Sequence, residues 1–112
     1  MNLENTKAQM RKGVLELCIL SIIAEEEIYS SDIIKRLEHS KLIVVEGTLY
    51  PLLTRLKNAG LLTYRWEEST QGPPRKYFQI TETGEAFLQG LIETWNELFN
   101  AVNQSTKNIT SK

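Results

Sequence analysis

Residues 47–60 read GTLYPLLTRLKNAG, and their apolar spacing is that of a short amphipathic helix. At 3.6 residues per turn the leucines fall on one side, where we expect them to face a core. These leucines are Leu49, Leu52, Leu53 and Leu56. Gly60 is suited to the left-handed position just past a helix end. Pro51 is expected in or next to the first turn, where its missing N–H costs little.

The other side of this helix carries side chains that suit the reading of base pairs. They are Tyr50, Pro51, Thr54, Arg55 and Asn58. A helix in the major groove uses Arg and short polar groups on base edges, and apolar groups against thymine methyls. Thr48 and the backbone N–H groups of the first turn can hold a phosphate. An amphipathic surface helix with no DNA role remains an alternative on this pattern alone.

The segment that follows predicts a hairpin with a basic pair beside its tip. Residues 61–68 and 75–81 read as strands, and STQGPP at 69–74 is turn chemistry. Adjacent strand residues point to opposite faces, so Arg75 and Lys76 both reach DNA only at a twisted tip. An ordinary solvated turn is the alternative. The candidate DNA contacts here are Gln71, Arg75 and Lys76, and Lys35 and Lys57 are candidates for further phosphate contacts.

Two more helices are predicted upstream. The first covers about residues 6–25, and nine of the twelve residues from 13 to 24 are apolar. A helix apolar nearly all round is buried on several sides, which suggests that a partner chain covers one of them. The second covers about residues 31–39, with Ser30 or Ser31 as its cap. Its apolar stripe is Ile33, Ile34 and Leu37.

A last helix is predicted from residues 81–83 to near Gln104, with a seam for a second chain. Its apolar residues recur in alternating steps of three and four, the spacing of a coiled coil. They are Leu88, Leu91, Trp95, Leu98 and Val102, with Phe87, Ile92 and Phe99 widening the stripe. One small domain cannot cover so wide a stripe, so we predict an obligate, twofold-symmetric homodimer. Its reading helices would face half-sites about 34–36 Å apart.

The element order is three helices, a hairpin and a long helix, which is the winged helix-turn-helix arrangement. The expected fold class is therefore mainly α with a small β-hairpin (α+β). We expect a DNA-binding unit at residues 1–82, a dimerisation helix at 83–105 and a frayed polar tail at 106–112. The expected dimer interface comprises Leu88, Leu91, Ile92, Trp95, Leu98 and Val102.

Composition limits the classes of protein that this chain can belong to. Its 112 residues, 41% hydrophobic and 24% charged, fit one ordinary globular domain. A net charge of -1 argues against a protein that coats nucleic acid through bulk charge. No apolar run approaches the roughly 20 residues of a membrane span. The N-terminus lacks a signal-peptide pattern, so we expect a cytoplasmic protein that contacts no membrane.

Side chains for catalysis or metal binding are scarce in the sequence. Cys18 is the single cysteine and His39 the single histidine, so we expect no disulfide, metal site or cofactor. With no phosphate-binding glycine loop and no recognisable acid–base pair, an enzyme is not expected. The apolar setting of Cys18 predicts a buried, inert thiol. A winged helix that binds only proteins is the other rival, and it requires Arg55, Arg75 and Lys76 to be idle.

Three stretches occur in a fixed order: GTLYPLLTRLKNAGLL at 47–62, GPPRKYF at 72–78 and ITETG at 80–84. They resemble the recognition-helix, wing and last-helix signatures of the PadR family of bacterial repressors. The resemblance implies a winged-helix dimer whose last helix packs against the partner's first helix. It also implies DNA contacts by Thr48, Tyr50, Thr54, Arg55, Arg75 and Lys76. The family often has Tyr-Gly-Tyr or His-Gly-Tyr before the second helix. This chain has IYSSD at 28–32, so no contact from that turn is carried over.

Trp95 has two readings, packing in the dimer interface or a platform for a flat ligand. ETWNE at 93–97 is similar in position to the tryptophan region of the family's multidrug-sensing branch. In that branch, tryptophans paired across the dimer axis sandwich flat aromatic drugs. Indoles stack on rings and attract cations, so a flat aromatic or cationic small molecule is the implied ligand. The candidate ligand-binding residues are Met10, Gly13, Leu17, Trp95, Glu97 and Phe99. A phenolic acid, or no effector at all, stays open.

Overall fold

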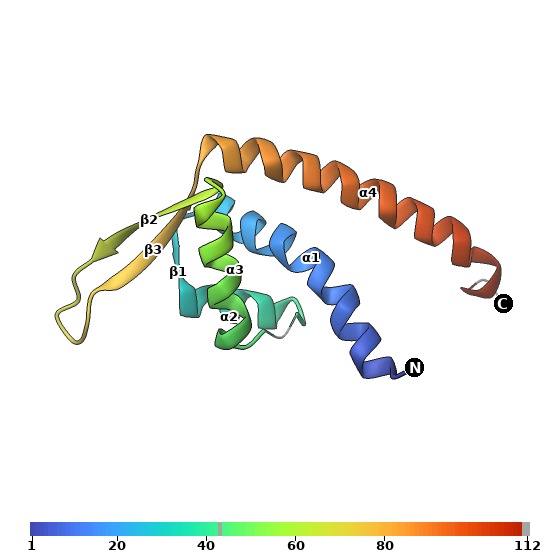
Figure 1. Cartoon of the computed structure of the whole chain (residues 1–112), viewed down its shortest axis with the longest axis horizontal. Helices are drawn as coiled ribbons and strands as arrows, with labels where there is room; N and C mark the ends of the chain where they lie inside the picture. The colour runs from blue at the N-terminus through green and yellow to red at the C-terminus, as the bar shows by residue number, and fades with distance from the viewer. Residues whose placement is uncertain (43, 111–112) are drawn as a thin grey trace.

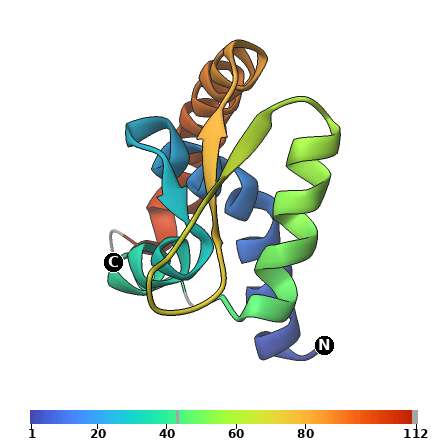
Figure 2. The same cartoon turned by 90° about the vertical axis from the view of Figure 1, so that its left-hand side faces the viewer.

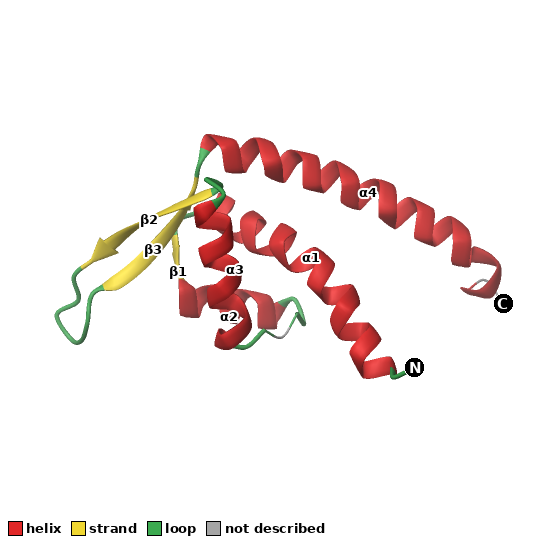
Figure 3. Cartoon of the chain, in the orientation of Figure 1, coloured by secondary structure: helices red, strands yellow, loops and turns green. Residues whose placement is uncertain are grey.

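The computed structural model describes residues 1–42 and 44–110. Within them, a head of three helices and a small sheet is followed by one long projecting helix (Figures 1 and 3). The elements are α1 (Leu3–Glu25), β1 (Ile28–Tyr29), α2 (Ser30–His39), α3 (Glu46–Asn58), β2 (Leu62–Glu67), β3 (Arg75–Ile80) and α4 (Glu82–Thr110). The fold class predicted from the sequence, mainly α with a small β component, is confirmed.

The core of the head forms where α1, α2 and α3 meet the inner face of the sheet. Ile19, Ile33 and Leu49 are each completely buried, one from each helix. Of the four leucines of α3, three are buried and Leu52 is half-buried, as their spacing predicts. Gly60 follows the helix with φ +81°, a conformation that costs glycine little. The fold therefore turns α3 so that its opposite side faces solvent.

The sheet has three strands rather than the two that the sequence predicts. β2 and β3 pair antiparallel from Leu62 opposite Ile80 to Glu67 opposite Arg75. The two-residue strand β1 adds to the other edge of β3, which lies in the middle (Figure 2). A segment of two residues shows no alternation, so the sequence gives no sign of it. β1 ties the hairpin, hereafter the wing, to the junction between α1 and α2.

One local prediction is wrong, and a second is right in position but not in its consequence. Neither Ser30 nor Ser31 caps α2, because Tyr29 occupies the cap position and makes no side-chain cap bond. Ser30 is instead buried in the first turn, where its hydroxyl shares a 3.3 Å hydrogen bond with the Tyr50 hydroxyl of α3. Pro51 lies next to the first turn of α3, as predicted, but the helix begins at Glu46, so the missing N–H falls where a helix bond would form. It cannot donate a bond to the carbonyl of Gly47, which lowers the number of helix bonds by one.

The helix α4 starts where Thr81 caps it. The Thr81 hydroxyl donates to the Gly60 carbonyl at 2.7 Å and accepts from the Gly84 N–H at 2.9 Å. Gly84 sits so close to the β2 entry that a Cβ there would lie 2.1 Å from the Leu61 carbonyl oxygen. These contacts fix the direction in which α4 leaves the head.

The far end of α4 is longer than predicted. Residues 106–110 are helical where we expected a frayed tail, and residues 111–112 lie outside the described part. The hydroxyls of Ser105 and Thr106 donate to carbonyls four residues back, each at 2.9 Å, which adds side-chain bonds to the final turns. No helix within the described ranges is long and apolar enough to cross a membrane.

Candidate nucleic-acid interface

The outward side of α3 is the side that the leucine spacing predicts. Tyr50 is 44% exposed, and Pro51, Thr54 and Asn58 are all exposed. The hydrogen bond between the Tyr50 and Ser30 hydroxyls holds the phenol against the start of α2. α3 therefore offers a phenol, a hydroxyl and an amide along one side, which are groups able to meet base edges.

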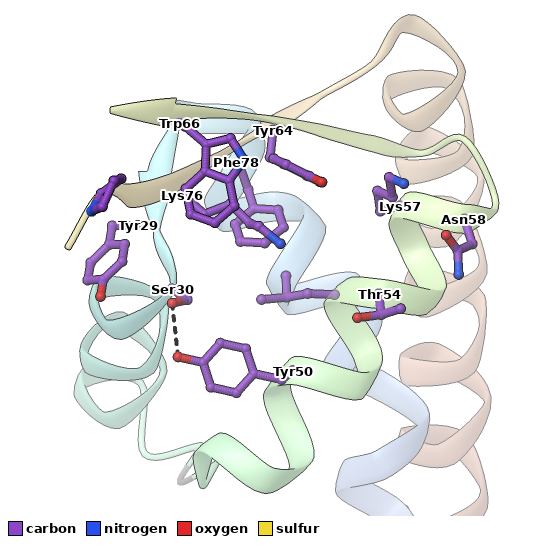
Figure 4. Close-up of a pocket in the computed structure, with 12 residues that line it drawn as sticks. Tyr29, Ser30, Tyr50, Thr54, Lys57, Asn58, Tyr64, Trp66, Lys76 and Phe78 are labelled. Carbon is purple, nitrogen blue, oxygen red and sulfur yellow. Dashed lines mark hydrogen bonds between the residues drawn. The ribbon is translucent and has the colours of Figure 1, made fainter. Parts of the chain in front are cut away.

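A hollow of about 430 Å³ lies between this side of α3 and the wing (Figure 4). We call it the α3–wing hollow. Figure 4 shows the strands supplying Tyr64, Trp66 and Lys76 on one side and α3 supplying Tyr50 and Thr54 on the other. Its lining residues are Tyr29, Ser30, Tyr50, Leu53, Thr54, Lys57, Asn58, Tyr64, Trp66, Pro74, Lys76 and Phe78.

Two lysine ammonium groups converge on one ring of the α3–wing hollow. Lys76 Nζ lies 4.1 Å from the centre of the Tyr64 ring and 5.3 Å from that of Trp66. Lys57 Nζ, from α3, lies 5.8 Å from the same Tyr64 ring. In residues 1–42 and 44–110, neither lysine has a carboxylate within ion-pair distance. The hollow is therefore positively charged, and a site of this charge favours an anion.

Arg75 and Lys76 lie on opposite faces of the wing, as strand alternation predicts. The Arg75 guanidinium stacks 5.0 Å from the centre of the Tyr29 ring, whereas Lys76 faces α3. Gln71 is exposed near the tip, where its N–H donates to the Ser69 hydroxyl at 3.3 Å. The tip therefore presents cations in two directions.

Arg55 and Thr48 turn away from the α3–wing hollow. Arg55 forms an ion pair with Glu16 of α1, although its side chain is 66% exposed. Thr48 borders a separate depression of about 310 Å³ that also includes Arg11 and Lys12 of α1. Both side chains lie on the edge of α3 that meets α1. The sequence shows the apolar side of a helix but not which neighbour flanks it.

Of the nine predicted DNA contacts, the hollow gathers four: Tyr50, Thr54, Lys57 and Lys76. Lys35 stands apart on α2, 3.9 Å from Asp32 of the same helix. Tyr64 and Trp66 line the hollow although neither was predicted as a site residue. Trp66 is paired with Lys76 across the strands, and alternation places Tyr64 on the same face. That register was the signal that could have found them.

Glu27, Arg65 and Gln79 form a hydrogen-bonded cluster on the other face of the wing. Glu27, in the turn after α1, accepts hydrogen bonds from Arg65 of β2 and from Gln79 of β3. The hydrogen bond from the Arg65 guanidinium lowers the pKa of Glu27, and the partnership raises the pKa of Arg65. The cluster neutralises Arg65, so the free cations of the wing are nearer its tip.

The predicted ligand residues lie far from this hollow, on α4 and α1. Trp95 is 41% exposed and tilts against Phe99, with ring centres 5.9 Å apart. Glu97 is exposed two residues further along α4, which is about half a turn round the helix from Trp95. Met10 is 72% exposed. Gly13 is exposed as well, with nothing within 4 Å of a Cβ built there, and Leu17 is half-buried against the core.

The predicted dimer seam is only partly open in a single chain. Leu88 is buried in the core of its own head, and Leu91 and Ile92 pack partly against it. Leu98 and Val102, further along α4, are 54% and 56% exposed. The open part of the seam therefore begins after the head ends.

The Cys18 thiol is the remaining reactive group that the sequence singles out. Cys18 is half-buried, and burial raises the pKa of its thiol, so the unreactive protonated form is favoured at neutral pH. No group of three or more metal-ligating side chains occurs in the part of the chain that the structure describes.

Comparisons with known proteins point in one direction. The profile of the transcriptional regulator PadR-like family matches residues 19–90. The chain is 60% identical to a PadR-like transcription factor from Bacteroides fragilis, with a TM-score of 0.76 over 89% of this chain and 97% of that one. A PadR-like transcriptional regulator from Bacillus cereus is 40% identical, with a TM-score of 0.76 over 86% and 94% of the two chains. A PadR family transcriptional regulator from Eggerthella lenta is 29% identical, with a TM-score of 0.84 over 91% and 89%.

Proposed function

Because this chain belongs to the transcriptional regulator PadR-like family, we propose that it is a homodimeric repressor that binds operator DNA through α3 and the wing. Its homologues are transcriptional regulators and not enzymes, and the chain is a DNA-binding regulator of the same kind. Three features of the chain support this proposal in detail: the surface that would meet DNA, the seam for a second chain and the pocket for a ligand.

The α3–wing hollow supports the choice of DNA-binding surface. Tyr50, Thr54 and Asn58 lie along the open side of α3, where hydrogen bonds to base edges need them. Lys57 and Lys76 flank them without carboxylate partners in the described ranges, which suits contacts to backbone phosphates. A protein-binding winged helix has no need of this pairing of cations with groups able to read bases. The surface is therefore the single observation that most favours DNA over a protein partner.

The outer part of α4 supports a second copy as the partner. Trp95, Leu98, Phe99 and Val102 are each at least 41% exposed, and they follow one another along one stripe. Contiguous apolar patches of this kind on a soluble protein mark interaction sites. The stripe has coiled-coil spacing, and a symmetric dimer would bury it against α1 and α4 of the second chain.

The same seam supports a flat cationic ligand as the signal for release. Two Trp95 rings brought together by a twofold axis would stack on an aromatic cation, and Glu97 would add a negative charge. Phe99 already leans on Trp95, which shapes one wall. A regulator of this family without a small-molecule effector is the alternative, in which Trp95 only packs.

DNA binding is tested with a duplex that the purified protein itself enriches from a random pool, measured by fluorescence anisotropy. We expect Tyr50→Ala to cost about 1–3 kcal/mol of binding to the enriched sequence. Lys57→Gln should weaken binding to all DNA sequences alike. It should also reduce the slope of log affinity against log salt concentration by about 0.9. Lys107→Gln, at the far end of α4, is the matched charge control. If the pool yields no enriched sequence, or all three variants bind like the wild type, α3 does not read DNA.

The ligand is tested by titrating a flat cationic dye and following tryptophan emission. Quenching that is lost in Trp95→Ala but kept in Trp66→Phe supports the pocket at the dimer axis. Equal quenching in wild type and Trp95→Ala rejects it.

A further inference from the structure

We propose that the α3–wing hollow is also a small-molecule site, which binds a flat aromatic anion and thereby excludes DNA. The ligand class is a carboxylate or sulfonate on a fused or substituted aromatic ring. The part of the inference that concerns DNA rests on the proposed function, while binding of the anion does not. The site differs in place and in charge from the pocket proposed beside Trp95.

Aromatic rings form much of the walls of the hollow, although a contact with a phosphate does not need them. Tyr64 meets Phe78 and Trp66 edge to face, with ring centres 6.0 Å and 6.1 Å apart. Trp66 stays 61% exposed, so a large apolar ring remains open to an incoming molecule. Tyr50 adds a ring to the lining from α3, with its hydroxyl turned toward Ser30 (Figure 4). Flat rings stack or pack edge to face on such surfaces, which favours an aromatic ligand over a bare ion.

The size of the hollow suits a small organic molecule. Its volume of about 430 Å³ lies within the roughly 300–1,000 Å³ that small-molecule sites span. Phe78 and Leu53 close its floor, since they are 5% and 1% exposed. The hydroxyls of Ser30 and Tyr50 and the Asn58 amide stand at its rim and can bond polar atoms of a ligand.

The charge of the hollow selects an anion. No aspartate or glutamate is among its lining residues. The ammonium groups of Lys57 and Lys76 both lie within 6 Å of the Tyr64 ring centre, so two positive charges gather on this part of the hollow. They attract a carboxylate and repel a cation.

Exclusion of DNA follows from the use of the same lysines. Lys57 and Lys76 are the cations that we assign to backbone phosphates, and a bound carboxylate offsets one of their two positive charges. The ring of the ligand would also stand between the wing and α3, where a DNA strand must enter. The anion therefore competes directly, without a change in the dimer.

The binding test uses 2-naphthoate as the probe and its neutral amide, 2-naphthamide, as the matched control. Proton–nitrogen correlation spectra of the full chain report the indole N–H of Trp66 and Trp95 separately, assigned with Trp66→Phe and Trp95→Phe. We expect 2-naphthoate to shift the Trp66 signal saturably and leave that of Trp95 unmoved. The amide should bind the wild type at least tenfold more weakly than 2-naphthoate does. The Lys76→Gln variant should likewise bind 2-naphthoate at least tenfold more weakly than the wild type. Lys76→Arg should retain binding, because it keeps the charge.

Three results would overturn the site: no saturable shift of Trp66, equal affinity for acid and amide, or a shift confined to Trp95. The competition test adds 2-naphthoate to the complex with the enriched duplex. We expect the apparent Kd of the protein for DNA to rise linearly with the concentration of 2-naphthoate, as direct competition requires, and the amide to have no effect. An unchanged Kd at full occupancy would overturn the exclusion of DNA. Saturable binding of 2-naphthoate by a protein that enriches no DNA sequence would instead leave the site standing and reject the proposed function.

Discussion

Arg55 carries the charge that the sequence assigns most directly to DNA, yet the fold pairs it with Glu16 of α1. The Glu16 side chain is 27% exposed, so this carboxylate is more shielded from water than its partner. The pair neutralises a cation at the edge of the reading helix. Glu16 thereby sets how much positive charge α3 presents, although it lies on a different helix.

Glu16→Gln should therefore strengthen binding to DNA at low salt. The released guanidinium gains a phosphate contact, which makes the salt slope steeper by about 0.9. Anisotropy titrations at several salt concentrations measure both quantities. In the double variant Glu16→Gln with Arg55→Gln the gain should vanish. A gain that persists in the double variant would mean that Glu16 acts through another residue.

Gly84 occupies a position where the fold leaves no room for a side chain. A Cβ at this position would meet the Leu61 carbonyl at 2.1 Å and the Ile80 side chain at 2.8 Å. Gly84→Ala should lower the free energy of unfolding by about 1–3 kcal/mol, the usual cost of overpacking. Gly90→Ala, on the same helix with nothing within 4 Å of its Cβ, should raise it by about 0.5–1 kcal/mol. Thermal unfolding followed by circular dichroism distinguishes the two, and equal effects would contradict the close approach.

Among the elements, the sheet owes its attachment to Glu27 and to the short strand β1. Folding lowers the pKa of Glu27 through its bond from Arg65, so the unfolded state binds a proton more readily than the folded one. The stabilisation is complete above the ordinary carboxyl pKa of 4.5 and is lost as the pH falls through the lower folded value. Acid should therefore loosen the base of the wing.

Glu27→Gln should be less stable than the wild type at pH 7, and the difference should shrink as the pH falls below 4.5. The amide keeps the shape but cannot form the charged bond with Arg65. Chemical denaturation at a series of pH values measures the difference, and Glu68→Gln is the control. A difference that is constant across this range would show that the charge of Glu27 contributes nothing.

The helices and the wing could be predicted because each has a repeating apolar pattern. The spacing of the leucines in α3 and of the apolar stripe in α4 predicted these helices and their apolar sides. Gly60 predicted where α3 ends. β1 is too short to show a pattern. The sequence near Ser30 predicts a helix cap, but its hydroxyl bonds to Tyr50 of another helix, a contact that only the tertiary structure creates. α4 continues to Thr110 through a polar segment that carries no apolar period, so its end could not be predicted.

The candidate site could be predicted only in part, for a similar reason. Tyr50, Thr54, Lys57 and Lys76 come together because helix and strand periods place them on facing surfaces. Thr48 and Arg55 lie at the border of the same helix face, and their direction depends on where α1 packs. Contacts between helices distant in sequence are not encoded in the period of either one.

For the whole molecule, the exposed stripe on α4 is the feature that a second chain must satisfy. Leu98→Glu places a charge in the expected seam and should convert a dimer into a monomer. Asn100→Glu adds the same charge about half a turn away on the same helix, and we expect it to remain dimeric. Sedimentation velocity separates the two states. A monomeric wild type, or two variants that behave alike, would refute the seam.

The chain is 58 Å long because α4 stands clear of the head for much of its length. The hollow beside α3 is built from residues between Tyr29 and Phe78, whereas the open stripe on α4 begins near Trp95. The two surfaces share no residue, so a substitution on one leaves the side chains of the other unchanged. After a gene duplication, one copy could gain new side chains on its DNA-reading face while it keeps the apolar residues of the proposed seam. A projecting helix thus gives a small protein two inheritable traits that can diverge separately.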